Sequence, residues 1–333
     1  MSVYLDYNAS TPIDERVLNM MIEVYKNNYG NADSRTHDYG DNARKIVEFA
    51  RQNVAELLGV KKDEVFFTSG ATESDNISIL GLQKYAEETG KRHIITTAIE
   101  HKAVLEPIDV LKKNGFETTY IKPDISGRIS EDELLTQVRS DTLLVSVMHV
   151  NNETGIIQPI KEIGEELSKS DVLFHVDAAQ SCGKLIDDLH NIKYNMLSAS
   201  AHKMNGPQGI GALVLKKKRY KLPPVKPILF GGGQEHGIRP GTLPTALIAG
   251  FGEACKIAKA EYPQNIKACH KIKETLIALL DNSGLEYEIN GEQMFCIPST
   301  INVSFNGINS EALMLSSKKY CGISNGSACN SSS

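Results

Sequence analysis

The chain has 333 residues, of which 41% are hydrophobic and 23% charged, a balance typical of folded globular proteins that excludes a natively disordered chain. Its 36 basic and 41 acidic residues give a net charge of −5, so no overall basic field would attract nucleic acid. The longest apolar run, at 143–148, is too short to span a bilayer.

Two further features concern the compartment. The amino terminus lacks the basic segment and long apolar run of a secretory signal, which predicts a cytoplasmic protein. The six cysteines contain no CxxC pair, so we predict neither a zinc site nor a disulfide framework, and we expect most of them to be reduced core residues.

The first half of the chain alternates helical patterns with short apolar runs. Ser10 or Thr11, followed by Pro12, predicts a helix start, and a second helix is predicted over 41–58 because Gly59 follows its apolar face. Strands are predicted at 65–68, 93–97, 117–121, 142–149, 172–176, 196–200 and 211–215. This order predicts an α/β fold, with a mainly parallel sheet sandwiched by helices.

The second half predicts a smaller α+β unit. Residues 221–241 are rich in Pro and Gly and read as a long ordered loop, followed by helices at 243–260 and 264–281. A strand at 299–305 and a helix at 310–317 come next. We therefore predict a large domain over 13–255, and a small domain formed by 1–12 and 256–333.

Polar residues directly after predicted strands are the candidates for chemistry, because open α/β sheets bind ligands beyond the carboxyl ends of their strands. In the stretch 68–73, Gly70 permits a tight turn, and the helix start at Ala71 and Thr72 could bind a phosphate. An ordinary Thr/Ser helix cap is the alternative. Neither GxGxxG nor a P-loop lysine motif is present, which argues against NAD and ATP.

Two later strand ends carry an acid and a lysine. Asp177 follows an apolar strand and could hold a protonated ring nitrogen, although it could equally cap the next helix. Lys203 lies between an apolar strand and a glycine-rich turn, where an ε-amine can form a Schiff base with an aldehyde, although most lysines are solvated surface charges. A phosphate site, an acid for a ring nitrogen and a sheltered lysine together match pyridoxal 5'-phosphate (PLP).

Three more residues could assist such a cofactor. His101 could stack on the ring or relay a proton, and Asn152 could bond a ring substituent or a substrate carboxylate; a satisfied loop histidine and an Asx-turn are the alternatives. Cys329 lies among small polar residues, a context typical of a mobile loop with an accessible thiol.

These residues together resemble the cysteine desulfurases of the NifS/IscS type, which are class V aminotransferase-like enzymes of PLP fold type I. The resemblance runs over essentially the whole chain, from 4–12 to 326–329. The matching blocks are TSGATESDN at 68–76, EHKAV at 100–104, VNNETG at 150–155, VDAAQS at 176–181, HK at 202–203, GPQGIG at 206–211, GGGQE at 231–235 and GT at 241–242.

The resemblance implies a role for each matching residue. Lys203 would bind the cofactor covalently, Asp177 would bind its ring nitrogen, and Gln180 its phenolic oxygen. His101 would stack on the ring and transfer protons, and Asn152 would help to place the substrate carboxylate. The phosphate would be held by Ala71, Thr72, Ser200 and His202, with Thr242 contributed by the partner subunit of a homodimer.

The implied reaction removes sulfur from L-cysteine. Cys329 would attack the substrate sulfur, keep it as a persulfide, release L-alanine and pass the sulfur to an acceptor protein, with no direct binding of nucleic acid or membrane. The acceptor pathway stays open between iron–sulfur cluster assembly, tRNA thiolation and DNA phosphorothioation.

The sequence departs from the family pattern in three places. Family members usually continue past the cysteine loop into a tail with an arginine for the substrate carboxylate, so we expect the sequence ending at Ser333 to be a truncated one. Ala32 and Pro240 stand where proline and serine are common, which affects loop geometry and partner contacts. A selenocysteine lyase, an ordinary aminotransferase and a catalytically poor scaffold for sulfur-relay partners remain alternatives, although transamination needs no thiol.

Overall fold

The computed structural model describes residues 2–325, so the predicted nucleophile Cys329 lies outside the described residues. The strands are β1 (Val3–Tyr4), β2 (Val65–Thr68), β3 (His93–Thr97), β4 (Glu117–Ile121), β5 (Thr142–Met148), β6 (Leu173–Asp177), β7 (Met196–Ser200), β8 (Gly211–Leu215), β9 (Tyr287–Ile289), β10 (Val303–Phe305) and β11 (Cys321–Gly322).

The α-helices are α1 (Glu15–Asn27), α2 (Asp38–Leu58), α3 (Ala71–Leu80), α4 (Gln83–Thr89), α5 (Lys102–Lys113), α6 (Glu131–Thr136), α7 (Ile160–Leu167), α8 (Ile186–Asn191), α9 (Thr245–Asp281) and α10 (Ser310–Ser317). Short 3-10 helices lie at η1 (Lys62–Glu64), η2 (Ala201–Lys203), η3 (Gln234–Gly237) and η4 (Gln293–Phe295). No helix of residues 2–325 has the length and apolarity that crossing a membrane requires.

A seven-stranded sheet forms the centre, in the order β2-β8-β7-β6-β5-β3-β4. All its neighbouring pairs are parallel except those that β8 makes with β2 and β7. Because β8 alone runs the other way, the carboxyl ends of the other six strands meet at one edge. The predicted mainly parallel sheet is thereby confirmed.

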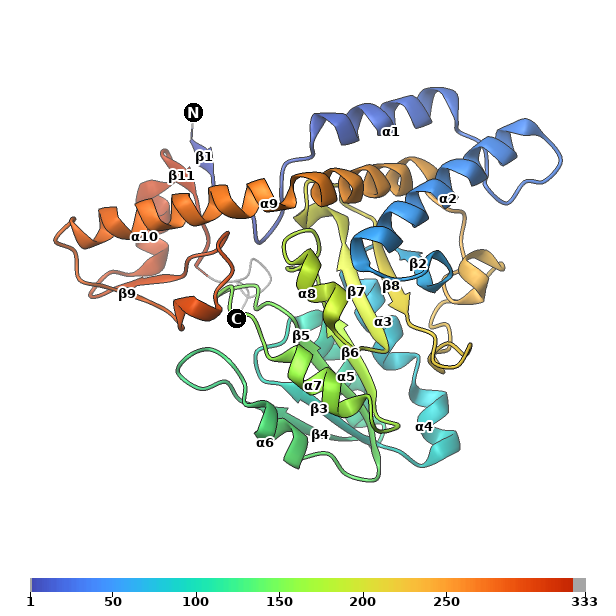
Figure 1. Cartoon of the computed structure of the whole chain (residues 1–333), viewed down its shortest axis with the longest axis horizontal. Helices are drawn as coiled ribbons and strands as arrows, with labels where there is room; N and C mark the ends of the chain where they lie inside the picture. Colours follow the sequence, from blue (N-terminus) through green and yellow to red (C-terminus); the bar gives the residue numbers. More distant parts are fainter. Residues whose placement is uncertain (1, 326–333) are drawn as a thin grey trace.

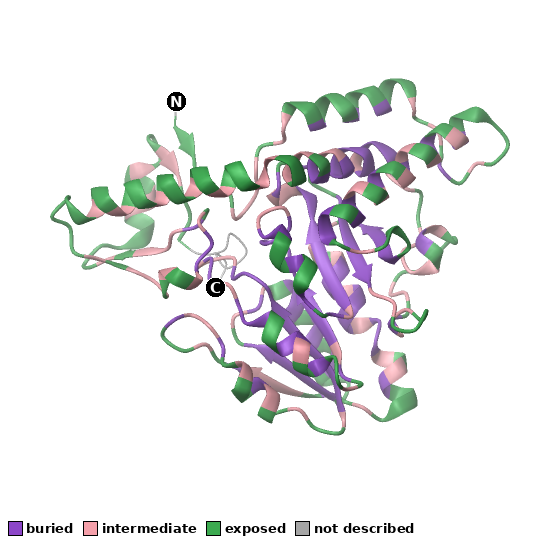
Figure 2. Cartoon of the chain, viewed as in Figure 1, coloured by how far each residue is buried: buried purple, intermediate pink, exposed green. Residues whose placement is uncertain are grey.

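Both faces of this sheet are covered by helices. Along β2, Phe67 belongs to the apolar cluster that contains α2, α7, α8 and α9, whereas its neighbour Phe66 belongs to the cluster that contains α3, α4 and α5. Successive residues point to opposite faces of a strand, so a strand buried on both sides must be continuously apolar. Figure 2 shows the sheet as the buried centre of the molecule.

Two small sheets lie beside this centre. The terminal strand β1 pairs in parallel with β11, and β9 pairs antiparallel with β10. The helix α9 runs from the sheet region to these elements (Figure 1). The pairing of β1 with β11 supports the predicted small domain of 1–12 and 256–333, which stays a prediction.

Two predictions about helices are wrong. The first helix begins at Glu15, not near Ser10, because Asp14 caps it by accepting the N–H of Arg16 at 2.8 Å. The helices predicted at 243–260 and 264–281 form the single helix α9, which contains Pro263. Proline costs a helical hydrogen bond, but the helix formers on both sides of it continue the helix.

The loop over 221–241 is held by a buried ion pair. Arg51, from α2, donates to both carboxylate oxygens of Glu235 at 2.7 and 2.8 Å, and the N–H of Phe67 donates to the same carboxylate at 2.7 Å. Glu235 has φ of 48°, which a non-glycine residue adopts only when its surroundings hold it there. This pair therefore fixes the loop that ends just before Thr242.

We expect Glu235→Gln to lower the free energy of unfolding by about 3–5 kcal/mol, because it removes the buried counter-charge of Arg51 and leaves only the more exposed Glu48 at 3.2 Å. Denaturant unfolding would measure this. Glu166→Gln is the matched control, since Glu166 pairs with Lys169 on the exposed surface and such pairs contribute at most about 1 kcal/mol. Equal effects of the two variants would contradict a stabilising role for the buried pair.

Candidate active site

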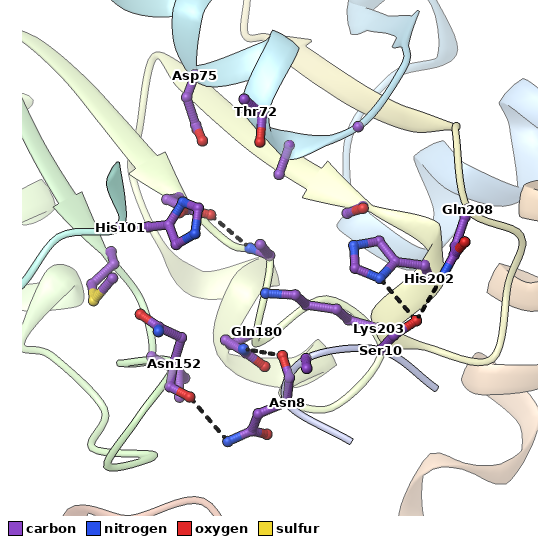
Figure 3. Close-up of a pocket in the computed structure, with 18 of the residues that line it drawn as sticks. Asn8, Ser10, Thr72, Asp75, His101, Asn152, Gln180, His202, Lys203 and Gln208 are labelled. Carbon is purple, nitrogen blue, oxygen red and sulfur yellow. Dashed lines mark hydrogen bonds between the residues drawn. The ribbon is translucent and has the colours of Figure 1, made fainter. Parts of the chain in front are cut away.

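The edge where the strands end opens into one cavity of about 430 Å3. Its walls come from the ends of β5, β6 and β7, the start of α3 and the segment 6–10 (Figure 3). Every predicted cofactor-binding residue except Thr242 lines it: Ala71, Thr72, His101, Asn152, Asp177, Gln180, Ser200, His202 and Lys203.

Lys203 ends the short turn η2 that follows β7, and its side chain points into the cavity (Figure 3). The amino-terminal segment fixes this turn, because both the N–H and the hydroxyl of Thr11 donate to the carbonyl of His202 at 2.8 Å. The Thr11 hydroxyl also accepts the N–H of Asn205 at 2.8 Å. Thr11, which was predicted to start a helix, therefore stabilises the turn that carries Lys203.

The start of α3 is a site for an anion. Its N-cap residue, Gly70, provides no side-chain cap to the first-turn N–H groups, which carry the positive end of the helix dipole. Gly70 has φ of 155°, a conformation that residues with a side chain rarely adopt, so the turn before α3 favours glycine. The Thr72 hydroxyl and the His202 imidazole also line the cavity.

An ion pair connects this anion site to the 221–241 loop. Arg239 donates to Glu73 at 3.0 Å, and the other Glu73 oxygen accepts the N–H of Ser69. Burial alone would raise the pKa of Glu73, but these hydrogen bonds hold it below its usual value. Both oxygens of the Glu73 carboxylate, at the edge of the anion site, are therefore already bonded to Arg239 and Ser69.

Asp177 ends β6 and His101 precedes α5. Asp177 is buried and accepts the N–H of Ala179 at 2.9 Å, so part of its carboxylate caps the following turn, as the alternative interpretation expected. His101 accepts the N–H of Ala103 through Nδ1 at 3.1 Å. Burial lowers the pKa of His101 although Asp177 opposes this, so its imidazole is neutral near pH 7.

Gln180 and Asn152 are positioned by a residue that sequence reasoning did not assign. The Asn8 carbonyl accepts from Gln180 Nε2 at 2.9 Å, and the Asn8 amide donates to the Asn152 carbonyl at 3.2 Å (Figure 3). Asn8 contacts Asn152, a residue 144 positions away in sequence, so no local sequence pattern predicts that Asn8 belongs to the site. Sequence reasoning also assigned no role in this site to the cavity residues Asp6, Ser10, Asp75 and Gln208.

The cavity fits PLP in size and in its donor set. Its volume lies within the usual range for a small-molecule site, ~300–1,000 Å3. It brings together uncapped N–H groups and hydroxyls for a phosphate, an amine for an aldehyde, and a carboxylate for a ring nitrogen. Thr242 is exposed and does not line the cavity of its own chain.

Comparison with known proteins identifies the family. The Aminotransferase class-V family matches residues 3–333. "Cysteine desulfurase IscS" of Pasteurella multocida is 44% identical over all of this chain and 82% of the relative, and that of Colwellia psychrerythraea is 45% identical over the same shares.

Solved structures agree. DndA from Streptomyces lividans is 45% identical with a TM-score of 0.86, covering 93% of this chain and 87% of that one. A NifS-like protein is 40% identical with a TM-score of 0.90, covering 96% and 87%. SspA in complex with cysteine is 36% identical with a TM-score of 0.85, covering 99% and 90%. The chain belongs to the class V aminotransferase family, and within it to the PLP-dependent cysteine desulfurases of PLP fold type I.

Proposed function

We propose that this desulfurase takes sulfur from L-cysteine, holds it as a persulfide on Cys329 and passes it to an acceptor protein. The observation that carries the proposal is the convergence of Lys203, Asp177 and the anion site on one cavity. The similar protein SspA was solved in complex with cysteine, which supports cysteine as the substrate.

When bound, PLP supplies a ring that accepts electron density from the substrate's Cα. Lys203 would hold the cofactor and, once released by the incoming substrate amine, move the α-proton with the neutral His101 nearby. Asp177 would keep the ring nitrogen protonated, and Gln180 would bond the phenolic oxygen. Ala71, Thr72, Ser200 and His202 would bind the phosphate, and Asn152 would help to place the substrate carboxylate.

Cys329 is close in sequence to a residue that lines this cavity. Ser324 lines the cavity and donates to Asp6 at 3.1 Å, and Cys329 follows it by five residues. Five residues of extended chain span at most about 18 Å, a length that would allow the thiol of Cys329 to act on a substrate bound in the cavity.

We also propose a cytoplasmic homodimer. Thr242 is exposed and follows the loop fixed by Arg51 and Glu235, a place from which it could bind the phosphate of a partner subunit. Exposed aromatic residues such as Tyr29 and Phe230 would be covered by the same contact. The acceptor would be a protein of iron–sulfur cluster assembly, tRNA thiolation or DNA phosphorothioation.

The test is turnover by the purified chain with PLP, L-cysteine and a reductant. We expect equal amounts of L-alanine and sulfide. With L-selenocysteine as the alternative substrate, a much larger kcat/KM would favour a selenocysteine lyase instead. A chain that binds PLP and turns over neither substrate would contradict the enzyme proposal and favour the scaffold for sulfur-relay partners.

A further inference from the structure

Asp75 is a buried carboxyl in the cavity that no role described so far uses. It lies in α3, one turn after the anion site, and is only 1% exposed. Its side chain lines the cavity (Figure 3). Neither carboxyl oxygen makes a hydrogen bond of ordinary geometry to residues 2–325, although the Ser198 side chain lies near enough to favour the ionised form weakly. This lack of a close partner is costly for a charged group and tolerable only if the group is neutral or is met by a ligand.

The histidine beside this carboxyl supplies it no positive charge. His175 Nε2 lies 3.5 Å from Asp75, but that imidazole already shares hydrogen bonds with the hydroxyls of Ser146 at 2.8 Å and Ser198 at 3.0 Å. Burial lowers the pKa of His175 to about 3. His175 is therefore neutral near pH 7, and it offers Asp75 no positive charge.

The charges that act on Asp75 come from three places. The strand β6 presents Asp177, the segment after β3 presents Glu100, and η2 presents Lys203. Burial raises the pKa of Asp75 well above its usual value, and the negative charge of Asp177 raises it further, against the smaller opposing effects of Ser198 and Lys203.

The remaining elements around α3 contribute no charge. The strands β2 and β8 carry no titratable side chain, β7 contributes only hydroxyls, and the buried face of α5 is apolar. Glu100 is itself buried, and burial raises its pKa to about 8 although Thr97 and the Met148 N–H donate to it. Burial thus favours the neutral form of both Asp75 and Glu100.

We propose that Asp75 is a neutral carboxylic acid in the native protein and a positioning residue that leaves the cofactor's ring nitrogen to Asp177. Two adjacent carboxylates would place two negative charges against one ring proton. A neutral Asp75 keeps the charges matched and offers an O–H donor to the cavity. The role toward the ring rests on the assignment of Asp177, whereas the protonation of Asp75 is a property of the chain alone.

The first experiment uses the apoprotein of the whole 333-residue chain and compares the pH dependence of unfolding in wild type and Asp75→Asn. The unfolded-state pKa of Asp is about 3.9. Above this pH the native wild type binds one proton more than the unfolded chain, so its stability falls as pH rises towards the folded-state pKa. The folding equilibrium constant of wild type relative to Asp75→Asn should therefore fall by up to about tenfold per pH unit.

Asp171→Asn, at an exposed position, is the matched control and should leave this pH dependence unchanged. A ratio between wild type and Asp75→Asn that is constant above pH 5 would mean that Asp75 is ionised in the native state, and would overturn the proposal. If the Asn variant fails to fold, Asp75→Ser gives the same comparison.

The second experiment reads the proton directly. The infrared difference spectrum between wild-type and Asp75→Asn apoprotein at neutral pH should contain the C=O band of a protonated carboxylic acid, and its absence would contradict the proposal. With PLP bound, the absorbance of wild type should show an alkaline titration step that Asp75→Asn lacks. If this step is present in both proteins, Asp75 does not act on the cofactor. A lack of L-cysteine turnover would refute the proposed function but would leave the apoprotein results valid.

Discussion

Lys203→Ala is expected to reduce L-alanine and sulfide formation by at least about 10³-fold, because one amine both holds the cofactor and moves the substrate proton. Lys203 is the lysine that lines the cavity, and Thr11 fixes its turn. After borohydride reduction of wild type with PLP, mass spectrometry should find the cofactor on the peptide that carries Lys203. The variant should lack this covalent adduct.

Lys184→Met is the matched control for this prediction. Lys184 is the other amine near the site: it donates to Gln180 at 3.4 Å, and burial together with the charge of Lys203 lowers its pKa to about 8. It does not line the cavity, so we expect its loss to reduce turnover by less than about tenfold through Gln180. Labelling of Lys184 in place of Lys203 would show that the assignment is wrong.

Much of the fold follows from local patterns. Five of the seven predicted sheet strands have the predicted bounds, and β5 and β6 differ by one residue at their ends. Except for the edge strand β4, these strands are buried almost throughout, so their apolar runs begin and end where the chain leaves the helix layers. The continuity of α9 through Pro263 was not predictable. In a sequence, proline usually indicates the end of a helix, but here strong helix formers on both sides allow the helix to continue.

The site was predictable where a residue directly follows a strand. Asp177, Ser200 and Lys203 lie at or just beyond the carboxyl ends of β6 and β7, and parallel strands bring such positions to one edge. Asn8 and Asp75 carry no such signal. Asn8 is brought in by contacts across the whole fold, and Asp75 looks in sequence like one more polar residue of a helix.

The role proposed for Cys329 depends on its being the reactive thiol of the chain. Burial raises the pKa of the Cys182 thiol to about 12, and it raises the pKa of Cys269 and Cys296 above the usual value. A thiol must ionise to act as a nucleophile. These three cysteines are therefore poor candidates for the nucleophile, which agrees with the prediction that most cysteines of the chain are inert.

Cys329→Ser is accordingly expected to lower sulfide release by about 10³-fold or more and to abolish the protein persulfide, since a hydroxyl cannot replace the thiolate as a nucleophile toward sulfur. In wild type the Cys329 thiolate would attack the substrate Sγ, an S–S bond would form as the Cβ–Sγ bond breaks, and the electron pair left on Cβ would take a proton to give alanine. Alkylation of the persulfide followed by mass spectrometry measures the product on the protein.

Cys329→Ser also distinguishes the role of the thiol in accepting sulfur from the role of the cavity in moving the α-proton. In deuterated water, Cys329→Ser with bound PLP should still exchange the α-proton of L-cysteine, because proton transfer requires Lys203 and not the thiol.

Cys321→Ser is the matched control: Cys321 lies eight residues earlier in β11, where its backbone pairs with Val3, and its loss should leave sulfide release within about twofold of wild type. Sulfide release that survives Cys329→Ser but not Cys321→Ser would move the nucleophile to β11. Loss of both proton exchange and sulfide in Cys329→Ser would mean that residue 329 supports the cofactor cavity rather than accepting sulfur.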